Sequence, residues 1–171
     1  MIYSMIEQEN MELVILDKIP KIAVYSPPNQ QPWDDAVTLA LTYAEIKYDI
    51  IFDDEVMNGD LYKYDWLHLH HEDFTGQYGK FYRYRNQSWY KQMENSFTQT
   101  AKKYGYDTVH KFKKTIALKI RDYVSKGGFL FAMCSATDSF DIALSFYNID
   151  FAHSIYDGTP IDSFDPLSVD Y

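Results

Sequence analysis

The stretch "GGFLFAMCSATDSFDIAL", residues 127–144, decides the fold. After the glycine pair comes a continuous apolar run, residues 129–134, which is typical of a parallel strand buried on both faces. Ser, Thr and Asp side chains then begin a second pattern with helical spacing. A strand that passes directly into a helix is the repeating unit of α/β proteins, so the segment predicts part of a parallel sheet.

Three shorter apolar runs precede it, namely "KIAVY" (21–25), "YDIIF" (48–52) and "DWLHLH" (65–70). Each is rich in residues that favour strands, and helical patterns separate them, as in "DDAVTLALTYAEI" (34–46). Alternating strands and helices form right-handed crossover units. The sequence therefore predicts an α/β fold of the flavodoxin-like kind, with a parallel sheet in the order 2-1-3-4 and helices on both faces.

A helical insertion is expected after the third strand. One apolar stripe has four-residue spacing, and a second stripe begins after a cap at Asp107 and ends at "KGG" (126–128). The stripes are Trp89, Met93, Phe97 and Ala101, then Val109, Phe112, Ile116, Ile120 and Val124. Basic residues occur between the apolar positions of the second stripe, at 111, 113, 114, 119 and 121, and their spacing predicts a solvated helix face.

Composition limits the function classes. The 171 residues suit one domain, with residues 1–20 as a leader or linker, 21–157 as the α/β domain and 158–171 as an acidic irregular tail. A net charge of −9 argues against general binding to nucleic acid or anionic membranes. The single cysteine excludes an internal disulfide, and no apolar run approaches the length of a membrane span. The acidic N-terminal stretch is unlike a signal peptide, so we expect a cytoplasmic location.

Cys134 stands between a predicted strand and a predicted helix, which is the position of a nucleophile elbow. The positive end of a helix dipole favours a thiolate there. A cysteine at the end of a buried strand can equally be a small core residue. Ser135, Thr137 and Asp138 follow it and would line the same pocket or simply cap the helix.

A polar cluster, "HHED" (70–73), follows the third strand. In a strand, His68, His70 and Glu72 would share one face, which suggests a metal-ligand set, although ligands two residues apart are spread too widely for all three to bind one ion. A polar network and a ligand-contacting rim are the other interpretations. We expect no bound metal and no cofactor, with His70, His71, Glu72 and Asp73 as pocket walls.

In parallel sheets, ligands bind beyond the carboxyl ends of the strands. This rule places three segments at one rim: the loop after Tyr25, which contains Trp33, the loop after His70, and the turn at Cys134.

Taken together, "KIAVY", "PWDDAVTLALTYAEI", "YDWLHLHHEDFTGQYGKFY" and "GGFLFAMCSATDSFDIAL" resemble the class I glutamine amidotransferase-like superfamily, and most closely a group of bacterial proteins labelled asparagine synthetase B. The resemblance covers residues 11–157. It implies a middle section of a longer protein, an incomplete amidotransferase-like domain, Cys134 as the nucleophile, and backbone N–H groups near Gly76 as oxyanion donors. True glutamine-dependent asparagine synthetases resemble a different design, in which a cysteine exposed at the mature N-terminus is the nucleophile.

The chain departs from the amidotransferase pattern at the elbow. Ala132 and Ala136 stand where Gly-x-Cys-x-Gly has glycines, and the only histidine after the cysteine, His153, does not match the family's histidine. We therefore expect an amidotransferase-like domain without a complete catalytic triad, which binds a small polar ligand or a partner at the rim. One alternative is a cysteine-dependent amidohydrolase that is active only in a longer protein. Another is a carbohydrate-related module like the trehalose-utilisation branch. An exposed sheet edge would favour self-association.

Overall fold

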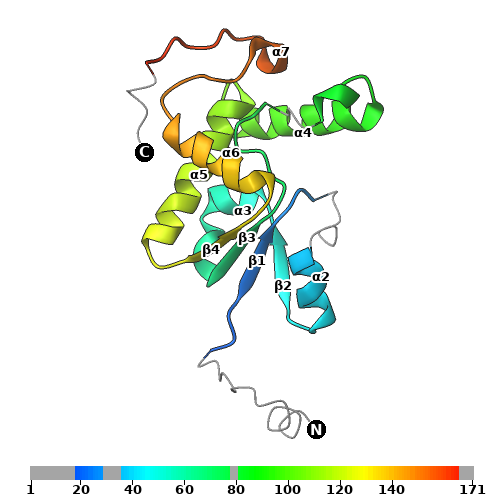
Figure 1. Ribbon diagram of the computed structural model, residues 1–171, viewed down its shortest axis with the longest axis vertical. Coiled ribbons are helices and arrows are strands. Elements are labelled where there is room, and N and C mark those ends of the chain that lie inside the picture. The colour runs from blue at the N-terminus through cyan, green and yellow to red at the C-terminus, as the bar shows by residue number, and fades with distance from the viewer. Residues whose placement is uncertain (1–17, 29–35, 78–80, 166–171) are drawn as a thin grey trace, which may run out of the picture.

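The computed structural model describes residues 18–28, 36–77 and 81–165 (Figure 1), so Trp33, Gly79 and most of the expected leader lie outside the described residues. The strands are β1 (Ile22–Tyr25), β2 (Tyr48–Ile51), β3 (Trp66–Leu69) and β4 (Phe129–Ala132). The helices are α2 (Ala36–Tyr43), α3 (Asp53–Asn58), α4 (Ser88–Lys103), α5 (Val109–Ser125), α6 (Ser135–Ser145) and α7 (Ser154–Asp157), with short 3₁₀ turns η2 (Asp60–Lys63) and η3 (Tyr82–Tyr84).

The sheet is parallel throughout and has the order β2-β1-β3-β4, which confirms the predicted α/β class and strand order. Alternate strand positions, including Ala23, Tyr25 and Leu67, enter one core together with α5. Since parallel crossovers are right-handed, the change of direction after β2 places α2 on one face and α3, α4 and α5 on the other. Figure 1 shows α2 beside β2, away from the group formed by α3, α5 and α6.

The predicted helical insertion between β3 and β4 consists of η3, α4 and α5. Helix α5 belongs to the same core, since its Phe112, Ile116 and Ile120 side chains are fully buried. Val124, in contrast, is exposed, so the apolar stripe ends one turn early. The helix cap is Thr108, whose hydroxyl accepts from the Lys111 N–H, and not Asp107. On α4, Tyr90 is buried where Trp89 was expected.

The prediction that the strand of residues 129–134 is buried on both faces was wrong. Phe129 is 57% exposed and Phe131 is 39% exposed, while Leu130 and Ala132 pack against the core. The reason is position: β4 is the last strand in the order, and only the face that carries Leu130 and Ala132 packs against the hydrophobic core. A continuous apolar run shows that a segment lacks polar side chains. It does not show how many faces of the strand other elements will cover. Among the described residues, no helix has the length and apolar character needed to cross a bilayer.

The prediction of a solvated basic face on α5 was wrong for two of its five residues, while Lys111 and Arg121 are exposed as expected. Lys113 and Lys114 are only 3% and 5% exposed. Lys113 lies against Asp53, whose side chain is 1% exposed, at an Nζ–Oδ1 distance of 2.8 Å. Lys114 donates to the main-chain oxygen of Ile149. Both lysines therefore face inward because groups from other elements compensate their charge or accept their hydrogen bonds.

Candidate functional site

Cys134 has an unusual backbone conformation, with φ 55° and ψ −139°. It lies two residues after the end of β4, with Met133 between them, and is the N-cap of α6. A positive φ costs a residue with a Cβ atom of order 1–3 kcal/mol, and such residues concentrate at functional sites. The thiol is exposed. The structure thus gives Cys134 the strained strand-to-helix turn of a nucleophile elbow, and it excludes the alternative of a buried core cysteine.

Two backbone hydrogen bonds hold this elbow against the end of β3. The N–H of Met133 donates to the Leu69 oxygen at 3.1 Å, and the N–H of Ala136 donates to the His70 oxygen at 3.2 Å. The second bond directly joins the first turn of α6 to the predicted polar cluster. Because Ala136 is fully buried, the helix end cannot move away without opening the core.

The elbow brings Cys134 together with the histidine pair His70 and His71. A ring nitrogen of each histidine and the Cys134 sulfur all lie within 4.8 Å of one another. The two imidazole rings are 3.4 Å apart at their centroids and tilted by 42°. A histidine nitrogen this close to a thiol can act as its general base after a small side-chain rotation. The loop after β3 thus brings a candidate base to the thiol, and the expectation that the chain lacks a complete triad stays a prediction.

The acids of the polar cluster turn back onto their own loop. Glu72 Oε2 accepts from the His70 N–H at 2.7 Å, and the main-chain oxygen of Glu72 accepts from the Ser139 hydroxyl at 2.8 Å. Asp73 Oδ1 accepts from the Thr75 N–H at 2.7 Å. Since β3 ends at Leu69, Glu72 does not continue the face of the strand, so it does not join His68 and His70 in the set of three that the alternation suggested. Both acids instead hold the loop that carries His70 and His71.

The remaining predicted site residues frame the elbow. Thr137 donates its hydroxyl to the Cys134 oxygen at 2.6 Å, which closes the first turn of α6. Asp138 is exposed in that same turn, where a carboxylate suits the helix dipole. The Ser135 hydroxyl oxygen is buried and makes no hydrogen bond within the described ranges. His153 accepts from the Ile155 N–H and caps α7, so it has a structural task of its own.

Gly76 packs the loop onto α5. Its φ is +74°, and a Cβ atom built on it would lie 2.6 Å from the Cα and N atoms of His110. We predict that Gly76→Ala lowers the free energy of unfolding by about 1–3 kcal/mol more than Gly105→Ala does, because only the first change adds a clash. Gly105 is the matched control, since its φ is +81° and nothing lies within 4 Å of its Cβ position. Urea unfolding of both variants measures the difference, and equal losses would contradict the packing role.

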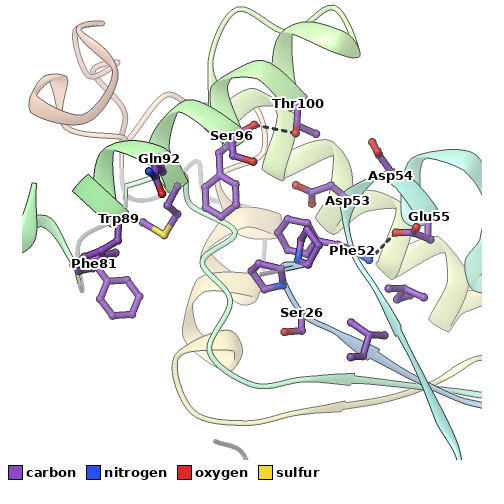
Figure 2. Close-up of a pocket in the computed structure, with 16 residues that line it drawn as sticks. Ser26, Phe52, Asp53, Asp54, Glu55, Phe81, Trp89, Gln92, Ser96 and Thr100 are labelled. Carbon is purple, nitrogen blue, oxygen red and sulfur yellow. Dashed lines mark hydrogen bonds between the residues drawn. The ribbon is translucent and has the colours of Figure 1, made fainter. Parts of the chain in front are cut away.

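A separate cavity of about 530 Å³ opens at the carboxyl ends of β1 and β2, between α3 and α4 (Figure 2). Figure 2 shows aromatic rings and acidic side chains around it, from strand ends and helices that are distant in sequence. Its lining includes Ser26, Phe52, Asp53, Asp54, Glu55, Phe81, Trp89, Gln92, Met93, Ser96, Phe97 and Thr100. Cys134 is not among the lining residues, because it follows β4 at the opposite end of the strand order.

Asp53 lines the cavity and belongs to a buried charged group that the sequence did not indicate. Lys113 Nζ donates to both carboxylate oxygens of Asp53 at 2.8 Å and to the Tyr25 hydroxyl at 3.0 Å. The Tyr25 hydroxyl in turn donates to Asp53. Burial, and then the Asp53 carboxylate, raise the pKa of Tyr25 well above its usual value, so the phenol stays protonated. The Phe52 ring centroid lies 4.4 Å from Lys113 Nζ and adds a cation–π contact.

Comparison with known proteins gives no match: no protein-family model, no curated protein and no solved structure corresponds to the chain. The site must therefore be interpreted from its own geometry.

Proposed function

We propose that this chain is an amidotransferase-like α/β domain in which Cys134 attacks the carbonyl carbon of a small polar amide. The observation that carries the proposal is the strained elbow of Cys134 with ring nitrogens of His70 and His71 inside 4.8 Å. A nucleophile, a base within reach and a helix N-terminus beside them form the minimum set for thiol acyl transfer. The proposed reaction resembles that of cysteine amidohydrolases, with the base supplied by the loop after β3 that carries His70 and His71 (the β3 loop).

The chemical steps balance without a cofactor. A histidine nitrogen takes the thiol proton, and the thiolate forms a bond to the amide carbon. The carbon–nitrogen bond then breaks, the histidine returns the proton to the leaving amine, and a thioester remains on Cys134. Water attacks the thioester carbon as the histidine takes a proton from the water. The carbon–sulfur bond then breaks, the carboxylic acid leaves, and the histidine returns the proton to the Cys134 sulfur. The first turn of α6 points its N–H end toward the elbow, where it favours the developing negative charge.

The charges around the elbow define the substrate class. The two segments that carry the site, 68–77 and 129–141, contain the acids Glu72, Asp73, Asp138 and Asp141 and no lysine or arginine. Anionic ligands such as phosphate esters are therefore disfavoured by like-charge repulsion. A neutral carboxamide, or one that carries an amine, suits this environment. Free ammonia or a small amine is then the expected first product.

A panel of small carboxamides tests the proposal. The purified chain is incubated with glutamine, asparagine and amides that carry no α-carboxylate, and ammonia release is followed with time. We expect slow turnover of at least one amide, with a rate that depends on the thiol. If no amide in the panel is hydrolysed, and none protects Cys134 from alkylation, the proposed reaction is wrong.

A further inference from the structure

A second group of potential ligand atoms lies outside this site. His110, in the first turn of α5, meets Asp150 and Asp157, which belong to the segment after α6. One atom of each, namely the ring nitrogen and two carboxylate oxygens, lies within 4.8 Å of the other two. The Nε2 atom of His110 is 3.1 Å from Asp150 Oδ2 and 3.9 Å from Asp157 Oδ2.

These groups are buried, and their polar atoms are poorly satisfied within the described part of the chain. The His110 side chain is 3% exposed, and neither ring nitrogen has a hydrogen-bond partner of good geometry. Asp157 is 10% exposed, and its Oδ2 atom also makes no hydrogen bond. The Nε2–Asp150 contact has hydrogen-bond length without the required direction. Leaving such atoms unsatisfied costs about 1–3 kcal/mol each, and a single ligand bound between them would offset that cost.

We propose that His110, Asp150 and Asp157 bind a divalent transition-metal ion, with zinc the best fit. One imidazole and two carboxylates form a three-ligand set of the kind that leaves the fourth position of a tetrahedral ion to water. Bonds of about 2.0–2.1 Å at tetrahedral angles separate neighbouring ligand atoms by about 3.3 Å. The separations of 3.1 and 3.9 Å lie on either side of that value. Two carboxylates balance the charge of the ion.

The carboxylates are already oriented for this role. The Thr159 hydroxyl is 3.1 Å from Asp150 Oδ2 and 2.7 Å from Asp157 Oδ1. Backbone N–H groups of Ala152 and Thr159 donate to the Oδ1 atoms of Asp150 and Asp157, at 3.0 and 2.9 Å. The bonds to Asp157 Oδ1 leave its Oδ2 atom directed toward His110, while the Asp150 Oδ2 atom that faces His110 is also held by Thr159. Such outer contacts commonly determine metal affinity by 10–100-fold.

A metal here would fasten the C-terminal segment to α5 next to the elbow loop. Gly76 lies against the backbone of His110, and Gln77 Nε2 donates to the Phe151 oxygen at 3.2 Å. A bound ion would therefore link the C-terminal segment to α5, directly beside the loop that carries His70 and His71. The inference goes beyond the proposed reaction and does not depend on it, because its ligands are separate from Cys134.

Zinc binding is measured on the full chain carrying Cys134→Ala, which removes the only thiol and with it the group His70, His71 and Cys134 as a competing zinc site. Titration of zinc chloride is followed by calorimetry and by the melting temperature. We expect about one zinc ion per chain and a higher melting temperature with zinc. Asp157→Asn keeps the side-chain shape and its Thr159 contact, and it should weaken zinc binding by at least about 10-fold. Thr159→Val should weaken binding by about 10–100-fold.

Asp141→Asn on α6 is the matched control, because it removes the same charge from an exposed position. Its zinc affinity should equal that of the Cys134→Ala parent. Three results would overturn the proposal: zinc binding that disappears with Cys134→Ala, equal affinity in the Asp157→Asn and Asp141→Asn variants, or an unchanged melting temperature at saturating zinc. A circular dichroism spectrum of each variant verifies that it is folded.

Discussion

Replacing Lys113 by methionine should lower the free energy of unfolding by about 3–5 kcal/mol. The change leaves the Asp53 carboxylate 1% exposed and without the ammonium group that donates to both of its oxygens. Removing one partner of a buried pair leaves an uncompensated charge in the core, and this charge accounts for most of the expected loss. Chemical denaturation followed by tryptophan fluorescence gives the value, and a loss below about 1 kcal/mol would contradict a tightly coupled pair.

A double variant separates the charge from the packing. Asp53→Asn together with Lys113→Met removes both charges and keeps side chains of similar size. Because the two groups touch, we expect the double variant to lose clearly less stability than the sum of the single losses. Lys103→Met is the matched control for the lysine change. Lys103 pairs with Asp54 at 2.7 Å on the surface, with side-chain exposures of 57% and 47%, and such pairs contribute about 0–1 kcal/mol.

Replacing Cys134 by alanine should abolish amide hydrolysis, with a loss of at least about 10³-fold for any carboxamide that the chain turns over. The thiol forms the covalent bond in the proposed reaction, and no other group takes that part. His70→Asn and His71→Asn should each retain the fold, and the one whose ring acts as the base should lower the rate by about 10²–10⁴-fold. Ammonia release measures all three variants, and a Cys134→Ala protein that stays active would show that the reaction lies elsewhere.

The order of the sheet and the position of the elbow follow from local patterns in the sequence. Short apolar runs, helical stripes and the turn at Cys134 were sufficient, because crossover handedness and the rule on strand ends then fix which loops meet. The contact between the His70 loop and the Cys134 turn is of this kind. His70 and His71 were predicted as pocket walls and not as a possible base for the thiol, because the amidotransferase pattern has its histidine after the cysteine.

Other features depend on partners that are distant in sequence. The burial of Lys113 requires Asp53 on another helix, and helical spacing alone cannot distinguish an inward lysine from a solvated one. The exposure of Phe129 depends on the place of β4 in the strand order. The meeting of His110 with Asp150 and Asp157 depends on the path of the chain after α6, which has no periodic pattern. Glu72 turns back because the strand ends earlier than its alternation suggests.

The most direct test of the central claim, that a histidine of the β3 loop activates Cys134, is the rate of iodoacetamide alkylation against pH. The chain has one cysteine, so the rate reports a single thiol. We predict that near pH 7 the folded chain reacts at least about 10-fold faster than the urea-unfolded chain, whose thiol has no histidine held beside it. His70→Asn or His71→Asn should remove most of that advantage. The account would be contradicted if the folded chain, like both variants, reacted no faster than the unfolded chain.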